Sequence, residues 1–525
     1  MKFFTFLLAL MSVSLISAQS INWQKLDMDD AFGYTSTVDS QNNVIVVASG
    51  PFETQATTMY IRKYDVNGNL LMQTSVDALN LAGGNSDNLL PYQVETDSQD
   101  NIIIAGVNTI INTSTSSSCQ TPPCYQTIAA KIIKFAPDGQ LVFNKTMLDH
   151  SNSFQQLRVD DNYLEIDDND NIYYNGVGLI TDTSNELAFG AILVKLAPDG
   201  TTLFTDVEDI VGNGNSISSG LMALGNNFVA MVNSTTFDEE LTAWDENGNV
   251  LWNINLDSSI DNFRAIVVDP ATNDTYVLAE TFPPNPLLTK IDSNGNILYT
   301  QTYSFGEDAV PKGLGFVAPD KLAFAGTTWS DLGNDSTLYT KVVNTSDGSS
   351  VSDHTYTLTQ NLSRIRDLET NSSSGAYYVT VNSTNNGGSP SSGTLHAYDI
   401  NGNEWHATNP NVRVRSVAIG QGSEVYVMTD NIWDLYQYNT TLSNQTFTDI
   451  DFKVYPNPVK NELFVNTQTD LNSVEIYDVL GKQILRLNDI ENDTPIDLSS
   501  LKSGIYFAKF NTQAGKSQTK KIIKQ

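Results

Sequence analysis

Four cationic side chains at similar places in a repeated pattern are the residues of this sequence most suited to binding an anion. They are Arg264, Lys312, Arg366 and Arg415, each placed just before a predicted strand. Guanidinium and ammonium groups bind carboxylates through charge-assisted hydrogen bonds, so a partial ring of them could hold an acidic sugar or another carboxylate. The alternative is structural: each cation pairs with carboxylates or carbonyls of a neighbouring repeat. Trp329, in the segment TTWSD, is the aromatic candidate for a ligand contact.

Motifs for common enzyme chemistries do not occur in the sequence. It contains no G-x-S-x-G nucleophile elbow, no phosphate loop ending in GK[ST] and no H-E-x-x-H. Of four histidines, His396 and His406 fall on the predicted strands of one hairpin, where a packed or exposed neutral imidazole is expected and not a metal ligand. Hydrolysis by paired carboxylates depends on their separation, about 5 to 9 Å, so the sequence nominates no catalytic residue.

No metal and no cofactor is predicted, and calcium is the one alternative. D-x-N-G-N segments resemble calcium loops but lack the sixth-position glycine and the later glutamate, and they fit a tight hairpin turn in full. These segments begin at Asp65, Asp245, Asp292 and Asp399. The densest carboxylate cluster is DDNDN at 167–171.

The two cysteines, Cys119 and Cys124, lie in the Ser/Thr/Pro-rich stretch STSSSCQTPPCYQT. In an exported protein they are expected to form a disulfide that closes a short loop. A zinc site would need further soft ligands nearby, and none is adjacent in the sequence.

The charge of the chain is strongly negative, with 60 acidic against 28 basic side chains and a formal net charge of -32. Residues 452–525 carry 10 basic and 8 acidic side chains, so the excess lies in the preceding part. Such a field opposes binding to nucleic acid or to anionic lipid, and an acidic surface keeps a secreted protein in solution.

Residues 1–18 have the pattern of a cleaved secretory signal peptide. Lys2 precedes an apolar run, and the small residues Ser17 and Ala18 follow it. No later run of about 18 apolar residues occurs, so we expect no transmembrane segment. We also expect a monomer.

Most of the chain repeats a two-part pattern. The first part is a polar turn followed by a β-branched or aromatic strand, as in DSQDNIIIAG and DDNDNIYYNG. The second is a hairpin with an Asn-Gly or Asp-Gly turn, as in KIDSNGNILY; glycine supplies the positive φ that such a turn needs. The first part occurs eight times, with strands starting near Asn43, Asn101, Asn171, Asn227, Asp274, Lys321, Ala376 and Glu424.

Each repeat supplies about four short antiparallel strands, the pattern of a β-propeller blade. We predict an eight-bladed β-propeller over residues 19–447, with seven blades as the alternative because the hairpin copy from Leu435 is degenerate. A strand at 23–27 could complete the last blade and remove the open edges of the ring. From Trp23 to about Phe447 the chain resembles secreted bacterial β-propeller repeat families with a D-x-x-G-N-x-Y-V-x-G core. Residues 318–321 lack the glycine and 269–275 insert a proline.

The connections that vary in length are expected on one face of the ring, because the turns within both parts of the repeat stay short. Functional residues concentrate on such loops. The four cations would then lie near the mouth of the central channel.

Residues 448–525 read as a small β-sandwich of about seven strands. Its recurring marks are a YPNP opening, two glycines and a basic end, at Tyr455, Pro456, Asn457, Pro458, Gly481, Gly504, Lys520, Lys521 and Lys524. On these residues the segment resembles the type A C-terminal sorting domain of cargo for the type IX secretion system of Gram-negative bacteria.

The resemblance implies export through the periplasm and across the outer membrane by the type IX machinery, to a secreted or cell-surface location. Release and attachment to lipopolysaccharide both stay open, as does cleavage of the domain. The predicted role is binding of a glycan or a surface protein through the variable-loop face. A carbohydrate-active hydrolase or lyase with carboxylates at the channel mouth is one alternative, and a structural surface protein without a ligand is another.

Overall fold

The computed structural model describes residues 21–525 except for a set of short gaps. Those gaps are 27–30, 51–57, 78–87, 113–123, 150–163, 182–186, 212–218, 235–238, 257–258, 307, 330–335, 359–362, 385–389, 401–403, 411–412, 423, 430–432, 440–451, 468–470, 478–482, 489–493 and 513–516. The predicted signal peptide therefore lies outside the described residues, and so does the predicted domain boundary at 447/448. The chain divides into two compact units, residues 1–440 and 441–525.

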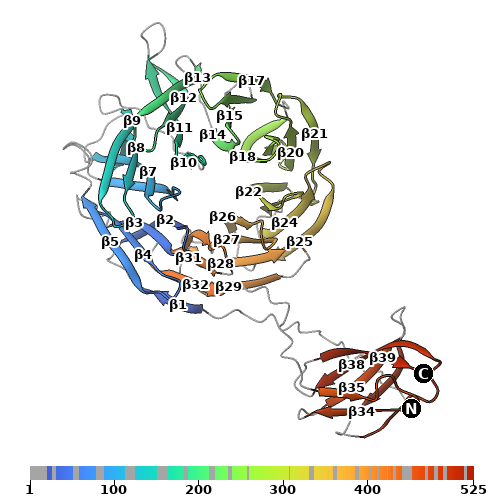
Figure 1. The fold of residues 1–525 in the computed structure, drawn as a ribbon. Coiled ribbons are helices and arrows are strands. Elements are labelled where there is room, and N and C mark those ends of the chain that lie inside the picture. The colour runs from blue at the N-terminus through green and yellow to red at the C-terminus, as the bar shows by residue number, and fades with distance from the viewer. Residues whose placement is uncertain are drawn as a thin grey trace, which may run out of the picture. The chain divides into compact units, whose positions relative to one another are not determined.

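The described part of the first unit forms eight four-stranded antiparallel sheets arranged as a ring (Figure 1). We number the sheets as blades 1 to 8. In each blade the first strand lies nearest the centre of the ring and the last lies at its circumference. The predicted β-propeller is thus confirmed, and the eight sheets correspond to the eight copies of the repeat.

Blades 1 to 4 run from residue 32 to residue 255. Their strands are β2 (Phe32–Val38), β3 (Val44–Gly50), β4 (Thr58–Tyr64) and β5 (Leu70–Asp77); β6 (Asn88–Thr96), β7 (Ile102–Asn112), β8 (Cys124–Phe135) and β9 (Leu141–Asp149); β10 (Leu164–Ile166), β11 (Ile172–Thr181), β12 (Leu187–Leu196) and β13 (Thr202–Val211); and β14 (Ser219–Gly225), β15 (Phe228–Ser234), β16 (Glu239–Asp245) and β17 (Val250–Asn255).

Blades 5 to 8 complete the ring. Their strands are β18 (Ile260–Val268), β19 (Thr275–Thr281), β20 (Pro286–Ile291) and β21 (Ile297–Thr302); β22 (Asp308–Ala318), β23 (Lys321–Trp329), β24 (Ser336–Asn344) and β25 (Ser350–Thr357); β26 (Ser363–Asn371), β27 (Ala376–Thr384), β28 (Pro390–Asp399) and β29 (Glu404–Pro410); and β30 (Val414–Ile419), β31 (Glu424–Thr429), β32 (Leu435–Asn439) and β1 (Ile21–Lys25).

Blade 8 is built from both ends of the propeller chain. Strand β1 pairs antiparallel with β32, with Trp23 opposite Gln437 and Lys25 opposite Leu435. The predicted closure by the N-terminal strand is confirmed. The degenerate hairpin from Leu435 contributes only its first arm among the described residues, and β1 takes the place of the second.

Buried lysine–aspartate pairs tie the third strand of a blade to the turn after the first. Lys63 Nζ lies 3.0 Å from Asp39 Oδ2, and Lys134 Nζ lies 2.8 Å from Asp97 Oδ2. Burial alone would raise the pKa of Asp97, but hydrogen bonds from Lys134 and Asn101 outweigh it and hold that pKa below its usual range. Removing one partner of such a pair leaves a buried charge, so these recurrent lysines are part of the scaffold.

Turns on adjacent blades are joined by residues with left-handed backbone conformation. Asn42 and Asp100 have φ of 64° and 60°. The backbone N–H of Ser40 in blade 1 donates to Asp100 in blade 2 (2.9 Å), and that of Gln421 in blade 8 donates to Asn42 in blade 1 (2.7 Å). Asn and Asp tolerate this conformation better than other non-glycine residues, which is why they occupy these corners.

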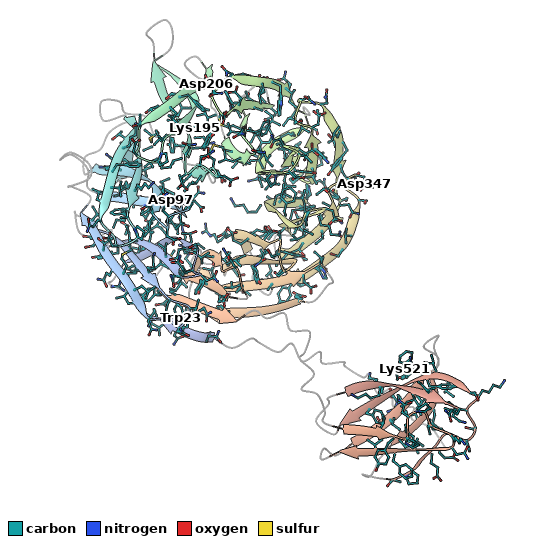
Figure 2. All side chains as sticks on the ribbon, in the orientation of Figure 1. Trp23, Asp97, Lys195, Asp206, Asp347 and Lys521 are labelled. Atoms are coloured by element: carbon teal, nitrogen blue, oxygen red, sulfur yellow. The ribbon has the colours of Figure 1, made fainter. Side chains whose placement is uncertain are left out.

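Outer-strand aromatic rings pack on the tight-turn glycine of the next blade. Gly295 has φ of 84°, and a Cβ there would lie 2.9 Å from Trp252 Cγ of blade 4. Trp252 Nε1 also donates to the Ser293 carbonyl at 3.0 Å. Trp23 repeats this arrangement on blade 1: its Nε1 donates to the Val66 carbonyl at 2.9 Å, at the outside of the ring (Figure 2).

The apolar core consists of clusters shared between neighbouring blades. One joins Leu221 and Phe228 of blade 4 to Ile266 and Val277 of blade 5. Adjacent blades therefore depend on one another for burial, as in other repeat folds.

The second unit contains a four-stranded and a three-stranded sheet around its own core. Its strands are β33 (Phe452–Tyr455), β34 (Glu462–Thr467), β35 (Leu471–Tyr477), β36 (Gln483–Asn488), β37 (Ile496–Asp497), β38 (Gly504–Thr512) and β39 (Ser517–Lys524). Val465, Ile476 and Phe510 are fully buried between the sheets. The predicted seven-stranded sandwich is thus present.

We predict that Trp23→Ala loosens the closure of the ring. The substitution removes the ring packed on Gly68 and the hydrogen bond to Val66, and we expect a loss of about 2 kcal/mol in the free energy of unfolding. The N-terminal strand should then detach, so trypsin should cleave after Lys25 faster than in wild type. Urea denaturation and limited proteolysis measure the two effects.

Trp252→Ala is the matched control, because Trp252 makes the same contacts within a chain-continuous blade. It should cost similar stability without faster cleavage after Lys25. Equal cleavage in both variants would contradict a special role for Trp23 in closure.

Candidate binding site in the central channel

The inner strands of six blades carry a β-bulge at the same place. In β2, β6, β18, β22, β26 and β30 the pairing register with the second strand shifts by one residue. A bulge leaves one residue without a partner and redirects its side chain. The bulge residues are Tyr34, Tyr92, Arg264, Lys312, Arg366 and Arg415.

All six bulge residues line one cavity of about 710 Å³ in the centre of the ring. Side chains project from the inner strands toward this centre (Figure 2). Blades 5, 6, 7 and 8 supply the four cations, and blades 1 and 2 supply the two tyrosines, so the six form one continuous arc. We call it the cation–tyrosine arc. The volume falls within the usual range for small-ligand sites.

We predicted from the sequence that these four cations lie just before the inner strands, and that prediction was wrong. Arg264 lies within β18, Lys312 within β22, Arg366 within β26 and Arg415 within β30. Because a bulge breaks the regular alternation of a strand, the periodicity of the sequence did not reveal that these residues belong to strands. Their predicted location near the channel agrees with their place in the cavity wall.

Contacts within the wall position at least two of the cations. Arg264 donates to Glu280 on β19, in the same blade, through Nε at 2.8 Å and also through Nη2. Arg415 Nε donates to the Tyr34 carbonyl at 3.3 Å, and its guanidinium lies 5.3 Å from the centre of the Tyr34 ring. Arg415 thus makes the contact with a neighbouring blade that a structural role requires. The side chains of Arg264 and Arg415 nevertheless line the cavity.

Side-chain hydrogen bonds join adjacent inner strands and stiffen the wall. Gln93 on β6 bonds both the N–H and the carbonyl of Leu164 on β10, at 3.2 and 2.8 Å. The Val417 N–H on β30 donates to Asp367 on β26 at 3.1 Å. These bonds hold the lining residues in place without a ligand, which lowers the entropic cost of binding.

Three glutamates form a second level of the channel. Glu95, Glu165 and Glu369 occupy equivalent positions near the ends of the inner strands β6, β10 and β26. Glu95 and Glu369 follow their bulge residues by three positions, which is about 10 Å along a strand. The glutamates therefore lie toward the tight-turn end, and the cation–tyrosine arc lies toward the variable-loop end.

Sequence reasoning missed this carboxylate cluster, although a signal was present. Each glutamate stands two residues before the first polar residue of the repeated turn: Glu95 before Asp97, and Glu165 before Asp167. Glu369 stands in the same way before Asn371. The other repeats lack a carboxylate there, so only the ring geometry shows that these three line one channel.

The protein surroundings favour the protonated form of these carboxyls. Desolvation raises the pKa of Glu95 to about 7, against the opposing effect of a hydrogen bond from Gln93. Desolvation, and then repulsion from Glu95, raises the pKa of Glu165 to about 8. Desolvation, followed by the charges of Asp367, Glu95 and Glu165, raises the pKa of Glu369 well above its ordinary value. The mutual repulsion indicates that the three share one electrostatic environment.

The other residues singled out in the sequence are described only in part. Trp329 ends β23, and its side chain is not among those described. Cys119 lies outside the described residues and Cys124 begins β8, so their disulfide stays a prediction. His396 is fully buried and stacks on Tyr398, as expected for a packed histidine.

In the three D-x-N-G-N turns that the structure describes in full, the aspartate uses its carboxylate oxygens within the turn. Asp65 accepts hydrogen bonds from the N–H groups of Asn67 and Asn69 and from the Asn69 side chain. Asp245 and Asp292 repeat this pattern. Across the described residues no group of three or more His, Cys, Asp or Glu side chains is arranged to hold a metal ion. Calcium binding by these turns remains an untested alternative.

In the second unit, the YPNP segment fastens the C-terminal strand. Asn457 donates to the Lys521 carbonyl at 2.7 Å and accepts from the Ile523 N–H at 2.9 Å. The exposed Tyr455 ring stacks on Phe464. Gly504 opens β38, and Lys520, Lys521 and Lys524 lie on β39, whereas Gly481 falls outside the described residues.

Comparison with known families identifies the second unit. Residues 453–525 match the family described as a secretion system C-terminal sorting domain. The chain is therefore exported cargo of the type IX secretion system with a β-propeller fold, as its sequence predicted. Among the described residues, no helix is long and apolar enough to cross a membrane. A comparison with curated proteins returned no match.

Several solved structures are distantly similar to the chain. An ulvan lyase described as a new family of polysaccharide lyase shares 11% identity with a TM-score of 0.44, over 75% of this chain and 96% of its own. The β-propeller domain of the Trilobed protease from Pyrococcus furiosus shares 9% identity with a TM-score of 0.40, over 73% and 99%. A eukaryotic initiation factor shares 10% identity with a TM-score of 0.38, over 90% and 98%. Likenesses this distant carry no argument about ligand or reaction.

We predict that the channel carboxyls make the propeller less stable as pH rises. Their pKa values are raised above the unfolded value of about 4.3, so the folded chain binds more protons than the unfolded chain. This favourable contribution is complete at low pH and is lost as pH rises through about 7 to 8.

The triple variant Glu95→Gln, Glu165→Gln, Glu369→Gln should therefore exceed wild type in the free energy of unfolding at pH 9. We expect a difference on the order of 1–2 kcal/mol, because water in the channel screens part of the effect. The difference should shrink toward pH 5. Urea denaturation at both pH values measures it, and a difference that does not change with pH would contradict the assignment.

Proposed function

We propose that this exported propeller is a binding protein that holds an anionic ligand, such as a glycan bearing carboxylate or sulfate groups, at the variable-loop end of its channel. The observation that carries the proposal is the cation–tyrosine arc: four consecutive blades present a cation at the same bulge, and the next two present a tyrosine. The arrangement suits an acidic sugar, because guanidinium and ammonium groups bind its anion while aromatic rings pack on the apolar face of the sugar ring.

The strongly negative net charge of the chain makes this cluster of cations more informative. The chain has 60 acidic and 28 basic side chains, so a channel lined by residues of average composition would be acidic. Concentrating cations at one level of a confined channel focuses the field on an incoming anion. Arg264 and Arg415 are held by Glu280 and Tyr34, which supports a site shaped before the ligand arrives.

A second candidate function is a carbohydrate-active hydrolase or lyase that uses the channel glutamates. The raised pKa of Glu95, about 7, would suit a general acid near neutral pH. Acid–base pairs, however, need environments that push their pKa values apart, and here Glu95, Glu165 and Glu369 are all shifted in the same direction. This favours binding over turnover.

The export route inferred for this protein supports an extracellular ligand. The predicted signal peptide would bring the chain to the periplasm of a Gram-negative bacterium, and the sorting domain would take it through the outer membrane. The ligand is then a molecule of the cell surface or the surroundings, and glycans with acidic groups belong to that class.

The double variant Lys312→Ala, Arg415→Ala tests the binding proposal. On an array of acidic and neutral glycans, the wild-type chain should retain acidic members and release them as salt increases. The double variant should bind the best ligand at least about tenfold more weakly, since each charged hydrogen bond contributes about 1.5–3 kcal/mol. Calorimetric titration gives the affinity of each variant.

Lys321→Ala is the matched control, because Lys321 begins β23 outside the cavity wall and pairs with Asp320 at 2.7 Å. It should bind like wild type. A double variant that binds acidic glycans as tightly as wild type would rule out the proposed site.

The same glycan panel also separates binding from catalysis. Reducing-end and double-bond assays should detect no product after prolonged incubation with the wild-type chain. Product formation that Glu95→Gln abolishes would instead favour the hydrolase or lyase.

A further inference from the structure

The two charge levels of the channel lie in one cavity and therefore act on one another. One cavity is lined both by the four cations of the arc and by the three glutamates, Glu95, Glu165 and Glu369. Glu95 and Glu165 are half-buried, and Glu369 is exposed toward the channel. The net charge that a ligand meets at the arc thus depends on whether the glutamates toward the tight-turn end of the channel are ionised.

We propose that anion binding at the cation–tyrosine arc is coupled to proton uptake by Glu95, Glu165 and Glu369, so that the channel binds its ligand more tightly as pH falls from about 9 to about 6. This inference rests on the proposed function and adds its regulation. An anion at the arc lies in the same cavity as the three carboxyls, so it repels their ionised forms and favours protonation.

The titratable groups facing the glutamates are few. From the inner strands around the cavity they are Tyr34, Tyr92, Arg264, Lys312, Arg366, Asp367 and Arg415. The arginines stay charged across this range. Desolvation raises the pKa of Tyr92, although the charge of Arg415 opposes it, so Tyr92 stays neutral. Asp367 accepts a hydrogen bond from the Val417 N–H.

Glu95 and Glu165 therefore change charge between pH 6 and 9, and the pKa of Glu369 is raised by the same surroundings. Desolvation, with mutual repulsion at Glu165, brings the pKa of Glu95 to about 7 and that of Glu165 to about 8, which places both transitions inside this range. By linkage, the gain in log10 of the binding constant on acidification equals the sum of the pKa increases that the ligand causes at the carboxyls. An increase of about a third of a unit at each carboxyl gives about a tenfold gain.

The experiment is calorimetric titration of the full chain with inorganic sulfate, which remains a dianion from pH 6 to 9. We expect the affinity to increase about tenfold from pH 9 to pH 6. Repeating the titration at pH 7.5 in two buffers of different ionisation heat should show net proton uptake. The triple variant Glu95→Gln, Glu165→Gln, Glu369→Gln should bind with an affinity that no longer depends on pH and should take up no proton.

Glu246→Gln is the matched control, because Glu246 is an exposed carboxyl in the turn between β16 and β17. It should keep the pH dependence of wild type. The wild-type series also tests the inference without any substitution, in case the triple variant does not fold.

The possible outcomes separate the two proposals. Sulfate binding to wild type with equal affinity at pH 6 and pH 9 overturns the coupling and leaves the anion site standing. If the triple variant still binds sulfate more tightly at pH 6 than at pH 9, the coupling to these glutamates is also overturned. No sulfate binding at any pH overturns both proposals.

Discussion

Pairing between the two ends of the propeller chain is the interaction on which the channel depends. Strand β1 lies against β32, and the Trp23 ring packs on the turn of blade 1 just as Trp252 packs on the turn of blade 5. Without that pairing, blade 8 would expose an open sheet edge and the inner strands would be free to separate. The channel wall and every residue in it are consequences of closure.

A bulge shared by six of the inner strands presents the charged side chains of the arc. It turns one residue of each of these strands into the cavity. Two hydrogen bonds between adjacent inner strands hold the wall rigid: Gln93 donates to the Leu164 carbonyl, and Asp367 accepts from the Val417 N–H. The scaffold charges, such as Lys134 with Asp97, are paired inside the blades and do not reach the channel. Repetition thus produced two classes of cation, one structural and one facing the cavity.

Opposite charges stacked along one axis give the channel its chemical character. Cations near the variable-loop end attract an anion, and carboxyls near the tight-turn end oppose it when ionised. The raised pKa of Glu95, about 7, means that modest changes in pH alter this balance. A single cavity therefore combines a binding surface with a means of adjusting its strength.

The sequence by itself determined the repeat, the strand order and the export domain, because these depend on local signals. Asn-Gly turns, alternating strands and the segment from Tyr455 to Pro458 are readable over a few residues. Only the tertiary structure decided which residues share the channel. The bulge placed Arg264 within β18 and not before it, and ring closure placed Glu369 of blade 7 in the same cavity as Glu95 and Glu165 of blades 2 and 3. The periodicity of the sequence shows which residues lie on the same face of one strand. Which residues of different blades face the same cavity depends on the curvature of the ring, and no local sequence pattern encodes that curvature.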